Sequence, residues 1–349
     1  MNASFWRGKS VFLTGHTGFK GGWLCHWLSN MGARVHGYSL GPPTAPNFFT
    51  VTRLEERLET STVGDILDLA SLQKALDASK ADVVFHLAAQ PLVRDSYKNP
   101  LDTLTANIVG TANLLEACRG SGSALAIVAV TSDKCYQNHD WLRPYRETDP
   151  LGGRDPYSAS KACAEIITET YRSSFLAELG KQLASARAGN VIGGGDWAAD
   201  RLVPDCLRAI DNGETLNVRS PNSVRPWQHV MEPLAGYLML AEQLYTEGAC
   251  YADAWNFGPN EADVKPVSWI VETLSNGGHG AQWSIDSRNQ PHEASVLRLD
   301  SSKAKLLLGW APRWGLETAL NKTVEWHEAW RNKSDMAAVT SEQIKAYVG

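Results

Sequence analysis

Apolar runs of strand length alternate with amphipathic segments of helix length through the first half of the chain. Ser10–Thr14 (SVFLT) has the composition of a buried strand, and a glycine turn and a helix from about Phe19 to Met31 follow it. Further strands are predicted at 34–40, 82–88, 125–131 and 183–187, with helices at about 101–118 and 157–178. This alternation predicts an α/β fold with a doubly wound, parallel sheet of Rossmann type, which binds ligands at the carboxyl ends of its strands.

The second half of the chain has a different pattern, with Gly- and Pro-rich loops at 193–196 and 219–226, shorter helices and fewer apolar strands. We therefore expect a sheet domain over residues 1–188, a smaller mixed lobe over 189–330 that covers the sheet's ligand edge, and a loosely attached C-terminal tail over 331–349. A helix and a strand within about 230–257 could return to the first domain.

Composition excludes several classes of partner. The 349 residues are 43% hydrophobic and 20% charged, and a net charge of −5 gives no general affinity for nucleic acid or anionic membranes. Six cysteines without C-x-x-C spacing favour reduced thiols, and no cluster of His, Cys and Asp has the spacing of a metal site. With no apolar signal segment and no run of about 18 apolar residues, we expect a cytoplasmic protein.

A glycine loop, Gly15-x-x-Gly18-x-x-Gly21, follows the first strand and opens a helix. Glycines there permit a tight turn and let backbone N–H groups approach a pyrophosphate at the helix N-terminus, which predicts a dinucleotide cofactor. The spacing is that of the short-chain dehydrogenase/reductase class. Residues expected to contact the cofactor are Gly15, Thr17, Gly18, Phe19, Lys20 and Gly21 in the loop, and Ser39, Asp65, Ile66, Ala88, Ala89, Gln90 and Asn107 beyond it. For Asn107, a structural amide inside its helix is the alternative.

The end of the second strand bears on which dinucleotide binds. It reads Tyr38-Ser39-Leu40, without the acidic residue that usually meets the adenosine ribose and without an arginine for a 2′-phosphate. No Lys or Arg lies between Ser39 and Thr52. The sequence therefore favours NAD, although this strand end by itself leaves the choice between NAD and NADP open.

Two polar groups of residues are candidates for the chemistry. Tyr157 and Lys161 are four residues apart in a predicted helix, so they share a face, and a nearby ammonium favours the phenolate of a tyrosine. Such a phenolate can take the proton of a substrate hydroxyl while the carbon loses hydride to the cofactor. The strand at 125–131 ends in Ser132-Asp133-Lys134: the serine can hydrogen-bond the same hydroxyl, and the other two form an acid/base pair. A dehydrogenase or epimerase needs no such pair, which predicts a further step such as loss of water.

These segments resemble the extended short-chain dehydrogenase/reductases that act on nucleotide sugars, and within them the 4,6-dehydratases whose substrate is CDP-glucose. The similarity runs over roughly residues 8–330 and is carried by TGHTGFKGGWL (14–24), GYSLGPPT (37–44), HLAAQPLVRDSY (86–97), TSDKCYQN (131–138), PLGGRDPYSASKACAE (150–165), RPWQHV (225–230) and LGWAPRW (308–314).

The resemblance implies oxidation at C4 by bound NAD⁺, loss of water across C5–C6 and return of hydride to C6. The product is a 4-keto-6-deoxy sugar of the kind used for deoxysugars and lipopolysaccharide O-antigens. A homodimer or tetramer is implied too, built on helices 101–118 and 157–178. The alternatives are a nucleotide-sugar 4-epimerase and a catalytically inactive NAD-binding sensor.

The roles within the Asp133–Lys134 pair stay open. Thymidine-linked dehydratases carry Thr-Asp-Glu here, so carrying the roles over makes Asp133 the acid at C6 and Lys134 the base at C5. In water both groups prefer the opposite protonation state, so that assignment needs a dry site, and the reversed assignment is the alternative.

The resemblance also implies a set of substrate contacts. Because the substrate carries two phosphates, cationic side chains are expected in the second lobe, where Arg201 and Arg225 would meet the nucleotide part, and Arg94 would face the hexose. Individually, arginines are often surface residues and lone histidines are often packed. The expected contacts are Arg94, Asn190, Arg201, Val203, Arg219, Arg225, His229 and His292.

Overall fold

The computed structural model describes residues 2–275, 282–286 and 296–349. Its centre is a seven-stranded parallel sheet in the order β3-β2-β1-β4-β5-β6-β11. The doubly wound α/β architecture predicted from the sequence is confirmed. The strands are β1 (Ser10–Thr14), β2 (Arg34–Ser39), β3 (Thr60–Val63), β4 (Val83–His86), β5 (Ala126–Val130), β6 (Gln182–Ala188) and β11 (Ala254–Phe257).

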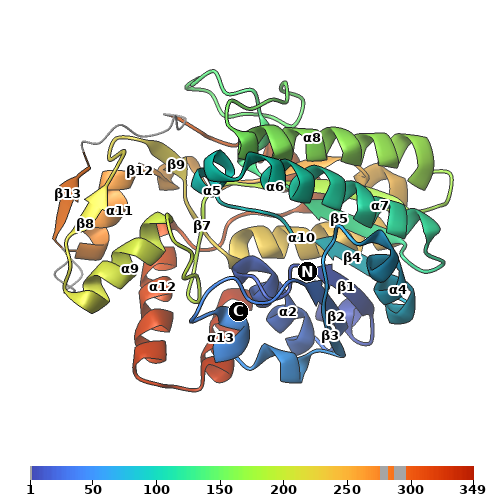
Figure 1. Ribbon diagram of the computed structural model, residues 1–349, viewed down its shortest axis with the longest axis horizontal. Coiled ribbons are helices and arrows are strands. Elements are labelled where there is room, and N and C mark those ends of the chain that lie inside the picture. Colours follow the sequence, from blue (N-terminus) through green and yellow to red (C-terminus); the bar gives the residue numbers. More distant parts are fainter. Residues whose placement is uncertain (1, 276–281, 287–295) are drawn as a thin grey trace.

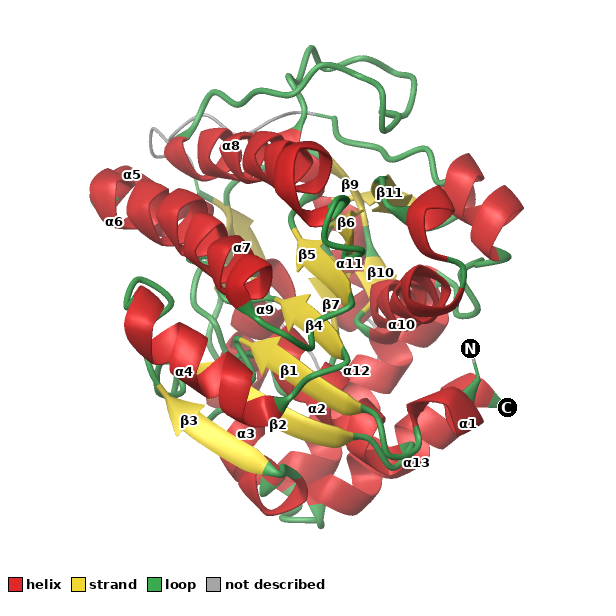
Figure 2. Ribbon diagram, turned by 90° about the vertical axis from the view of Figure 1, so that its right-hand side faces the viewer, coloured by secondary structure: helices red, strands yellow, loops and turns green. Residues whose placement is uncertain are grey.

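Helices cover both faces of the sheet (Figure 2). Alternate strand residues point to opposite faces, so Phe12 and Val84 pack beneath one helical layer, and Val11 and Val83 beneath the other. The first layer holds α4 (Leu69–Ser79), α5 (Val93–Lys98), α6 (Pro100–Leu104), α7 (Gly110–Gly120) and α8 (Pro156–Tyr171). The second layer holds α2 (Phe19–Asn30), α3 (Phe48–Val51) and α10 (Met231–Thr246).

The predicted helix at 101–118 is interrupted by a π-helical turn, η2 (Thr105–Val109), which joins α6 to α7. A second π turn, η4 (Arg172–Leu176), follows α8, and a 3₁₀ turn, η3 (Asp133–Cys135), follows β5. Other short turns of this kind are η1 (Leu54–Arg57), η5 (Gly248–Tyr251), η6 (Glu261–Asp263) and η8 (Ala304–Leu308).

The smaller lobe lies to the left in Figure 1 and packs around its own apolar cluster. Its helices are α9 (Leu202–Asn212), α11 (Val267–Leu274) and, reaching toward the sheet domain, α12 (Leu316–Arg331). Its strands form three small pairs: β7 (Val191–Ile192) with β10 (Gln228–His229), β9 (Val224–Pro226) with β12 (Val264–Pro266), and β8 (Leu216–Val218) with β13 (Trp283–Ile285). Between these segments the chain returns to the sheet, where α10 packs on it and β11 pairs with β6.

Two parts of the chain differ from the sequence-based expectation. Strand β3, with the sequence TSTV, was not predicted, because a half-exposed edge strand lacks the apolar run of a central one. The expectation of a loosely attached C-terminal tail is wrong. Helix α13 (Met336–Val348) packs against α2, with Ile344 and Tyr347 in the main core, and the Tyr347 hydroxyl donates a 2.7 Å hydrogen bond to Glu232. A short helix, α1 (Ala3–Trp6), lies at the other terminus.

Candidate active site

The glycine loop joins β1 to α2, and its glycines serve different purposes. Gly15 has a φ of +84°, and a Cβ there would lie 2.7 Å from the backbone nitrogen of Ala88. A Cβ on Gly21 would lie 2.1 Å from the carbonyl oxygen of Gly15. Both therefore close the turn itself. Gly18, the N-cap of α2, has an extended backbone, and its Cβ would come no nearer than 3.4 Å to other protein atoms. Its missing side chain keeps the helix N-terminus open, as the approach of a pyrophosphate requires.

Residues expected at the adenosine end lie along the same strand edge. Thr17 and Ser39 pair through their hydroxyls at 2.9 Å, and Thr17 also donates to the carbonyl of Leu40. Ile66 is buried against Gly110, whereas Asp65 is exposed. These positions fit a ribose and an adenine.

The nearest cation after β2, Arg53, is committed elsewhere. Its guanidinium forms an ion pair with Asp335 at 3.0 Å. The strand end at Ser39 therefore offers no arginine to a 2′-phosphate from this stretch, in keeping with NAD.

Asn107, in the π-helical turn η2, is hydrogen-bonded to the segment that follows β4. Its amide accepts a hydrogen bond from the backbone N–H of Gln90 (2.8 Å) and donates to the carbonyl of Gln90 (3.0 Å) and to Ser160 (2.8 Å). Because the side chain is buried and these bonds occupy its amide, the structure favours the structural alternative for Asn107 over a side-chain contact with the cofactor. Ala88 and Ala89, which follow β4, are part of the segment that these hydrogen bonds hold.

The candidate catalytic residues meet at the carboxyl edge of the sheet. Ser132 caps the η3 turn, where its hydroxyl accepts a hydrogen bond from the Lys134 N–H (3.2 Å) and donates one to Asp133 Oδ1 (3.1 Å). A further side-chain hydrogen bond joins Ser132 to Tyr157. Asp133 is buried, and its Oδ2 has no hydrogen-bond partner among the described residues. The structure thus brings together the serine, the aspartate and the tyrosine.

Electrostatics at Tyr157 differ from the sequence-based expectation. Burial raises the pKa of Tyr157 to about 12, and the hydrogen bond with Ser132 and the charge of Arg201 only partly offset it. Burial also lowers the pKa of Lys161 to about 8, which weakens it as a cation. In the protein alone, burial therefore opposes both the phenolate of Tyr157 and the ammonium of Lys161.

Burial and the neighbouring cations have opposite effects on the pKa of Asp133. It raises the pKa of this carboxyl, although Lys134, Arg225 and Lys20 favour the carboxylate. A raised pKa makes this carboxyl better suited to act as a general acid. Lys134 is half-buried and lines a separate cavity of about 330 Å³, together with Asp155 and Ser158 at the start of α8.

Lys20 belongs to the reacting centre as well as to the glycine loop. It lies in the first turn of α2, and its ammonium is 5.8 Å from the ring centroid of Tyr237. Burial, followed by the charges of Arg201 and Lys161, lowers its pKa to about 7. The sequence indicated a cofactor contact for Lys20 and gave no sign that its charge would also reach Asp133.

Tyr237, on α10, was missed as a member of the site. It is fully buried, its hydroxyl has no partner among the described residues, and its environment includes Tyr157 and Asp133. The signal available in the sequence was the possible return of the helix near 233–245 to the first domain.

The predicted substrate arginines gather between the two lobes. Arg94, from α5, and Arg219, from the smaller lobe, both pair with Asp200, at 3.3 and 2.8 Å. Arg201 pairs with Asp196 at 2.7 Å. Its charge also reaches Tyr157 and Lys20.

Buried Arg225, on β9, lies close enough to Asp133 to influence its ionisation. These four arginines come from segments far apart in the sequence, and together they would supply the positive charge that a diphosphate requires.

The other four predicted substrate contacts are not arginines. His229 is fully buried between Trp23 and Trp314, and its Nδ1 accepts a hydrogen bond from the Met231 N–H, so the prediction of a substrate contact is wrong and the packed alternative holds. The side chain of Val203 belongs to the smaller lobe's core. Asn190 is half-exposed after β6. His292 lies outside the described residues.

No group of three or more His, Cys, Asp or Glu side chains that could hold a metal ion occurs in the described part of the chain. All six cysteines are free thiols. Among the residues that the structure describes, no helix combines the length and the apolar character that crossing a membrane demands.

Comparison with known proteins places the chain in a family. A family model described as GDP-mannose 4,6 dehydratase matches residues 12–323. The chain belongs to this family. A curated relative from Salmonella typhimurium, named CDP-glucose 4,6-dehydratase, is 50% identical over an alignment that covers 100% of this chain and 98% of that protein.

Solved structures agree in fold. A UDP-glucuronic acid 4-epimerase from Bacillus cereus, in complex with UDP-glucuronic acid and NAD, superposes with a TM-score of 0.80 at 24% identity, covering 92% of this chain and 99% of that one. An NAD-dependent NDP-hexosamine 5,6-dehydratase involved in tunicamycin biosynthesis has a TM-score of 0.76 at 25% identity, covering 91% and 97%. The epimerase likeness supports the Rossmann-type fold alone.

Proposed function

We propose that the protein is an NAD-dependent CDP-glucose 4,6-dehydratase, which converts CDP-glucose to CDP-4-keto-6-deoxyglucose. The observation that carries the proposal is the Asp133–Lys134 pair directly after Ser132, with Asp133 close to buried Tyr157, because a simple dehydrogenase or a 4-epimerase needs no such pair. The relative named CDP-glucose 4,6-dehydratase, similar over the full chain, supports both the reaction and the choice of nucleotide.

The glycine loop fits a dinucleotide, since Gly18 leaves the N-terminus of α2 open. Residues that would hold the cofactor are those of the loop, Ser39 and Ile66 at the adenosine end, and Tyr157 and Lys161 at the reacting end. When bound, NAD⁺ supplies a hydride acceptor for C4, a hydride donor for C6 and a positive charge in the cleft.

Tyr157 begins the proton movements of the reaction. With Ser132 hydrogen-bonded to the same oxygen, it takes the proton of the C4 hydroxyl while C4 becomes a ketone. The ketone acidifies the proton at C5. Lys134 is the proposed acceptor of that proton, and Asp133 donates its proton to the C6 hydroxyl, which leaves as water when the C6–O bond breaks. A proton returns to C5 as hydride reaches C6.

Burial of Asp133 favours this assignment over the reversed one, because it raises the pKa of the carboxyl and so helps to keep the proton on the acid. The two assignments differ in which residue exchanges the C5 proton with solvent. We expect C5 deuterium exchange on a trapped 4-keto intermediate to survive in Asp133→Asn and to vanish in Lys134→Met. Exchange that persists in the methionine variant and vanishes in the asparagine variant would establish the reversed roles.

The arginines between the lobes support a nucleotide diphosphate substrate. Arg94 and Arg219 share the single carboxylate of Asp200, so their joint positive charge exceeds its negative charge. A diphosphate would complete that balance from the solvent side. Charge of this kind recognises phosphates and does not read the base.

Incubation with CDP-glucose tests the proposed function directly. A dehydratase produces a 4-keto sugar, which absorbs in the ultraviolet after alkali, whereas an epimerase yields an isomer of equal mass and a sensor yields nothing. In parallel, CDP-glucose is expected to raise the melting temperature more than the dTDP-, UDP- or GDP-linked sugars do. A larger shift with another nucleotide would overturn the substrate assignment.

We also propose a cytoplasmic homodimer that contributes to deoxysugar synthesis for lipopolysaccharide. Free thiols fit a reducing compartment. Leu101 (75% exposed) and Val109 on the α6–α7 helix and Ile166 (55%) on α8 expose apolar surface on two helices that lie side by side, and a second copy could bury that surface (Figures 1 and 2).

A further inference from the structure

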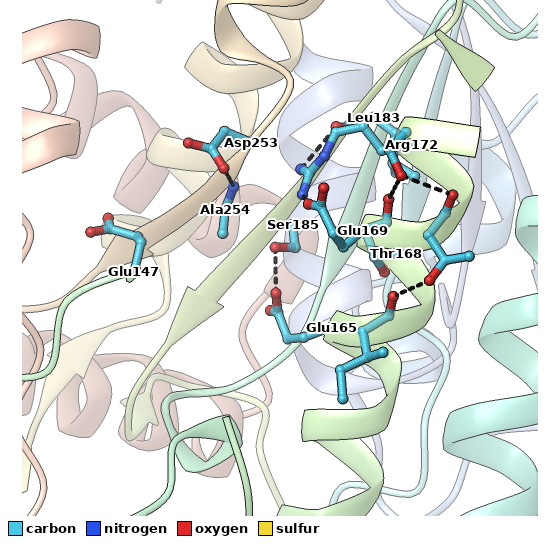
Figure 3. Close-up of polar contacts among 12 residues, drawn as sticks. Glu147, Glu165, Thr168, Glu169, Arg172, Leu183, Ser185, Asp253 and Ala254 are labelled. Carbon is cyan, nitrogen blue, oxygen red and sulfur yellow. Dashed lines mark hydrogen bonds and ion pairs between the residues drawn. The ribbon is translucent and has the colours of Figure 1, made fainter. Parts of the chain in front are cut away.

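A buried carboxylate lies one helical turn after Lys161 on α8. Glu165 is 3% exposed, and its two oxygens accept hydrogen bonds from three side chains. Oε1 accepts from Thr131, and Oε2 accepts from Ser185 and from Arg187, both at 2.7 Å. Figure 3 shows the Glu165 carboxylate directed from α8 toward Ser185 on β6. The carboxylate is therefore held in a single position.

The partners of Glu165 come from the strand ends that carry the chemistry. Thr131 directly precedes Ser132 at the end of β5, and Ser185 and Arg187 lie on β6. Glu165 thus links α8, which carries Tyr157, to both strands at the sheet's carboxyl edge.

Arg187 extends the link to the loop after the catalytic turn. Its guanidinium donates to the hydroxyl of Tyr136 (2.8 Å) and to the carbonyl of Glu147 (3.1 Å). Tyr136 in turn donates to Asn256 on β11 at 2.7 Å. Thr131 precedes the Asp133–Lys134 turn and Tyr136 follows it. Both are therefore hydrogen-bonded to the buried Glu165–Arg187 ion pair.

Four groups face Lys161: Lys20 on α2, His86 on β4, Cys135 in η3 and Glu165 on α8. Burial lowers the pKa of His86 to about 3, so the ring is neutral. Burial also raises the pKa of the Cys135 thiol well above its usual range, which leaves it neutral.

Glu165 is the group among these four that carries negative charge at neutral pH. Burial alone would raise its pKa, but Arg187, with the hydrogen bonds from Thr131 and Ser185, holds that pKa below the ordinary value. Burial lowers the pKa of Lys161, and the charge of Glu165 is the main influence that opposes this.

We propose that Glu165 is a positioning residue of the reaction, which holds the Ser132 strand end against α8 and supplies the negative charge that the Lys161 ammonium faces. The role in catalysis rests on the proposed function, while the electrostatic role concerns the protein itself. A purely structural ion pair would stabilise the fold without setting the charge of Lys161.

The test is Glu165→Gln, which keeps the shape of the side chain and removes its charge. The midpoint of the Lys161 titration is expected to fall by about 1–2 pH units. It is measured by NMR on protein with ¹³C-labelled lysine, with the resonance assigned through Lys161→Met. The matched control is Glu169→Gln, which removes the same charge one turn further along α8, where Glu169 is exposed and pairs with Arg172. In the control the midpoint is expected to stay.

A second variant separates charge from folding, because Glu165→Gln leaves Arg187 buried without its partner. The double variant Glu165→Gln/Arg187→Gln removes both charges. It is expected to recover part of the lost melting temperature while the Lys161 midpoint stays low. A midpoint that returned to its original value in the double variant would overturn the proposal, since unpaired Arg187 would then be the cause.

Kinetics provide the functional readout. The alkaline limb of the kcat/KM profile for 4-keto sugar formation is expected to move to lower pH in Glu165→Gln and to stay in Glu169→Gln. If Glu165→Gln lowers the melting temperature but moves neither this limb nor the Lys161 midpoint, the residue is structural only and the proposal is wrong. Failure of the proposed function would be recognised differently. The unaltered enzyme would then form no 4-keto product, and the NMR titration of Lys161 would be unaffected.

Discussion

Asp133 and Tyr157 share a buried neighbourhood in which desolvation opposes the ionisation of each. It raises the pKa of the Asp133 carboxyl, and it raises the pKa of the Tyr157 phenol to about 12. The protein alone therefore favours the protonated form of the tyrosine and helps to protonate the aspartate. In the proposed mechanism Asp133 acts as its protonated form, and Tyr157 would act with the positive charge of a bound NAD⁺ nearby. Burial thus suits Asp133 to its proposed role as an acid and opposes the proposed role of Tyr157 as a base.

Asp133→Asn is expected to inactivate the enzyme and to stabilise the fold at neutral pH. Because the folded-state pKa is raised, the folded protein binds more protons than the unfolded chain at pH values above the unfolded pKa, so stability is lost as pH rises through that window. Asparagine does not titrate. The gain in unfolding free energy should therefore be small near pH 4 and reach about 1–3 kcal/mol near pH 7.5. Urea denaturation at both pH values measures it, and an equal gain at the two values would contradict the raised pKa.

Tyr157→Phe is expected to lower kcat by about 10²–10⁴-fold, because it removes the group that takes the C4 proton. Ser132 is the side chain that hydrogen-bonds the phenol, so the melting temperature should change little. The assay is alkali-dependent ultraviolet absorption of the 4-keto product, with CDP-glucose binding by calorimetry as the control. A variant that turns over at the unaltered rate would exclude Tyr157 from the chemistry.

At the scale of elements, the glycines of the loop between β1 and α2 serve two different purposes. The sequence motif does not distinguish them. Gly15 and Gly21 are in contact with backbone atoms, so their absence of Cβ is required by the fold. Gly18 has room for a Cβ within the protein, so its absence serves the approach of a ligand. The turn requires the first two, and the binding of a dinucleotide explains the third.

Substituting these glycines by alanine should therefore give different outcomes. Gly21→Ala is expected to lower the melting temperature strongly, because its Cβ would lie 2.1 Å from the Gly15 carbonyl oxygen. Gly18→Ala is expected to leave the melting temperature of cofactor-free protein nearly unchanged and to weaken NAD binding by about tenfold or more. Thermal denaturation and calorimetric titration with NAD⁺ measure the two effects. Unchanged NAD affinity in Gly18→Ala would contradict the assignment.

The elements also differ in how well the sequence predicts them. Central strands such as β5, with the apolar sequence AIVAV, are clear from composition. Edge strand β3 is not, because its side chains face solvent. The π turn at Thr105–Val109 leaves no local signal either, since its residues suit an α-helix, and its position reflects the bonds that Asn107 makes to Gln90 and Ser160.

At the scale of the molecule, ion pairs connect the smaller lobe to the sheet domain. Asp200 pairs with Arg94 from one side and with Arg219 from the other. The C-terminal helix closes the opposite side of the sheet domain, where Tyr347 reaches Glu232 on α10. On the outer face, helices α6 and α8 expose the apolar side chains of Leu101 and Ile166 to solvent.

The double substitution Leu101→Glu/Ile166→Glu is expected to convert the proposed dimer to a monomer. Acidic groups on an apolar contact would be desolvated without partners, whereas on the free helices they stay in water. Light scattering after size exclusion measures the mass, and the melting temperature of the monomer reports on the fold. The matched control is Leu142→Glu, since Leu142 (77% exposed) is about as exposed as Leu101 but belongs to the loop between η3 and α8. If the unaltered protein is already monomeric, or the control dissociates too, this face is not the interface.

The sequence by itself determined the central strands of the sheet, the glycine loop and the placement of Ser132 and Asp133 after a strand and of Tyr157 on a helix, because strand and helix periodicity and turn chemistry are local properties of the chain. The tertiary structure decided what surrounds them. It placed Lys20 near Asp133, committed Asn107 to Gln90, packed His229 between tryptophans and attached the C-terminal helix to the core. Each depends on residues that crossover connections bring together from distant segments, and on burial, which changes the charge of a group without changing its identity.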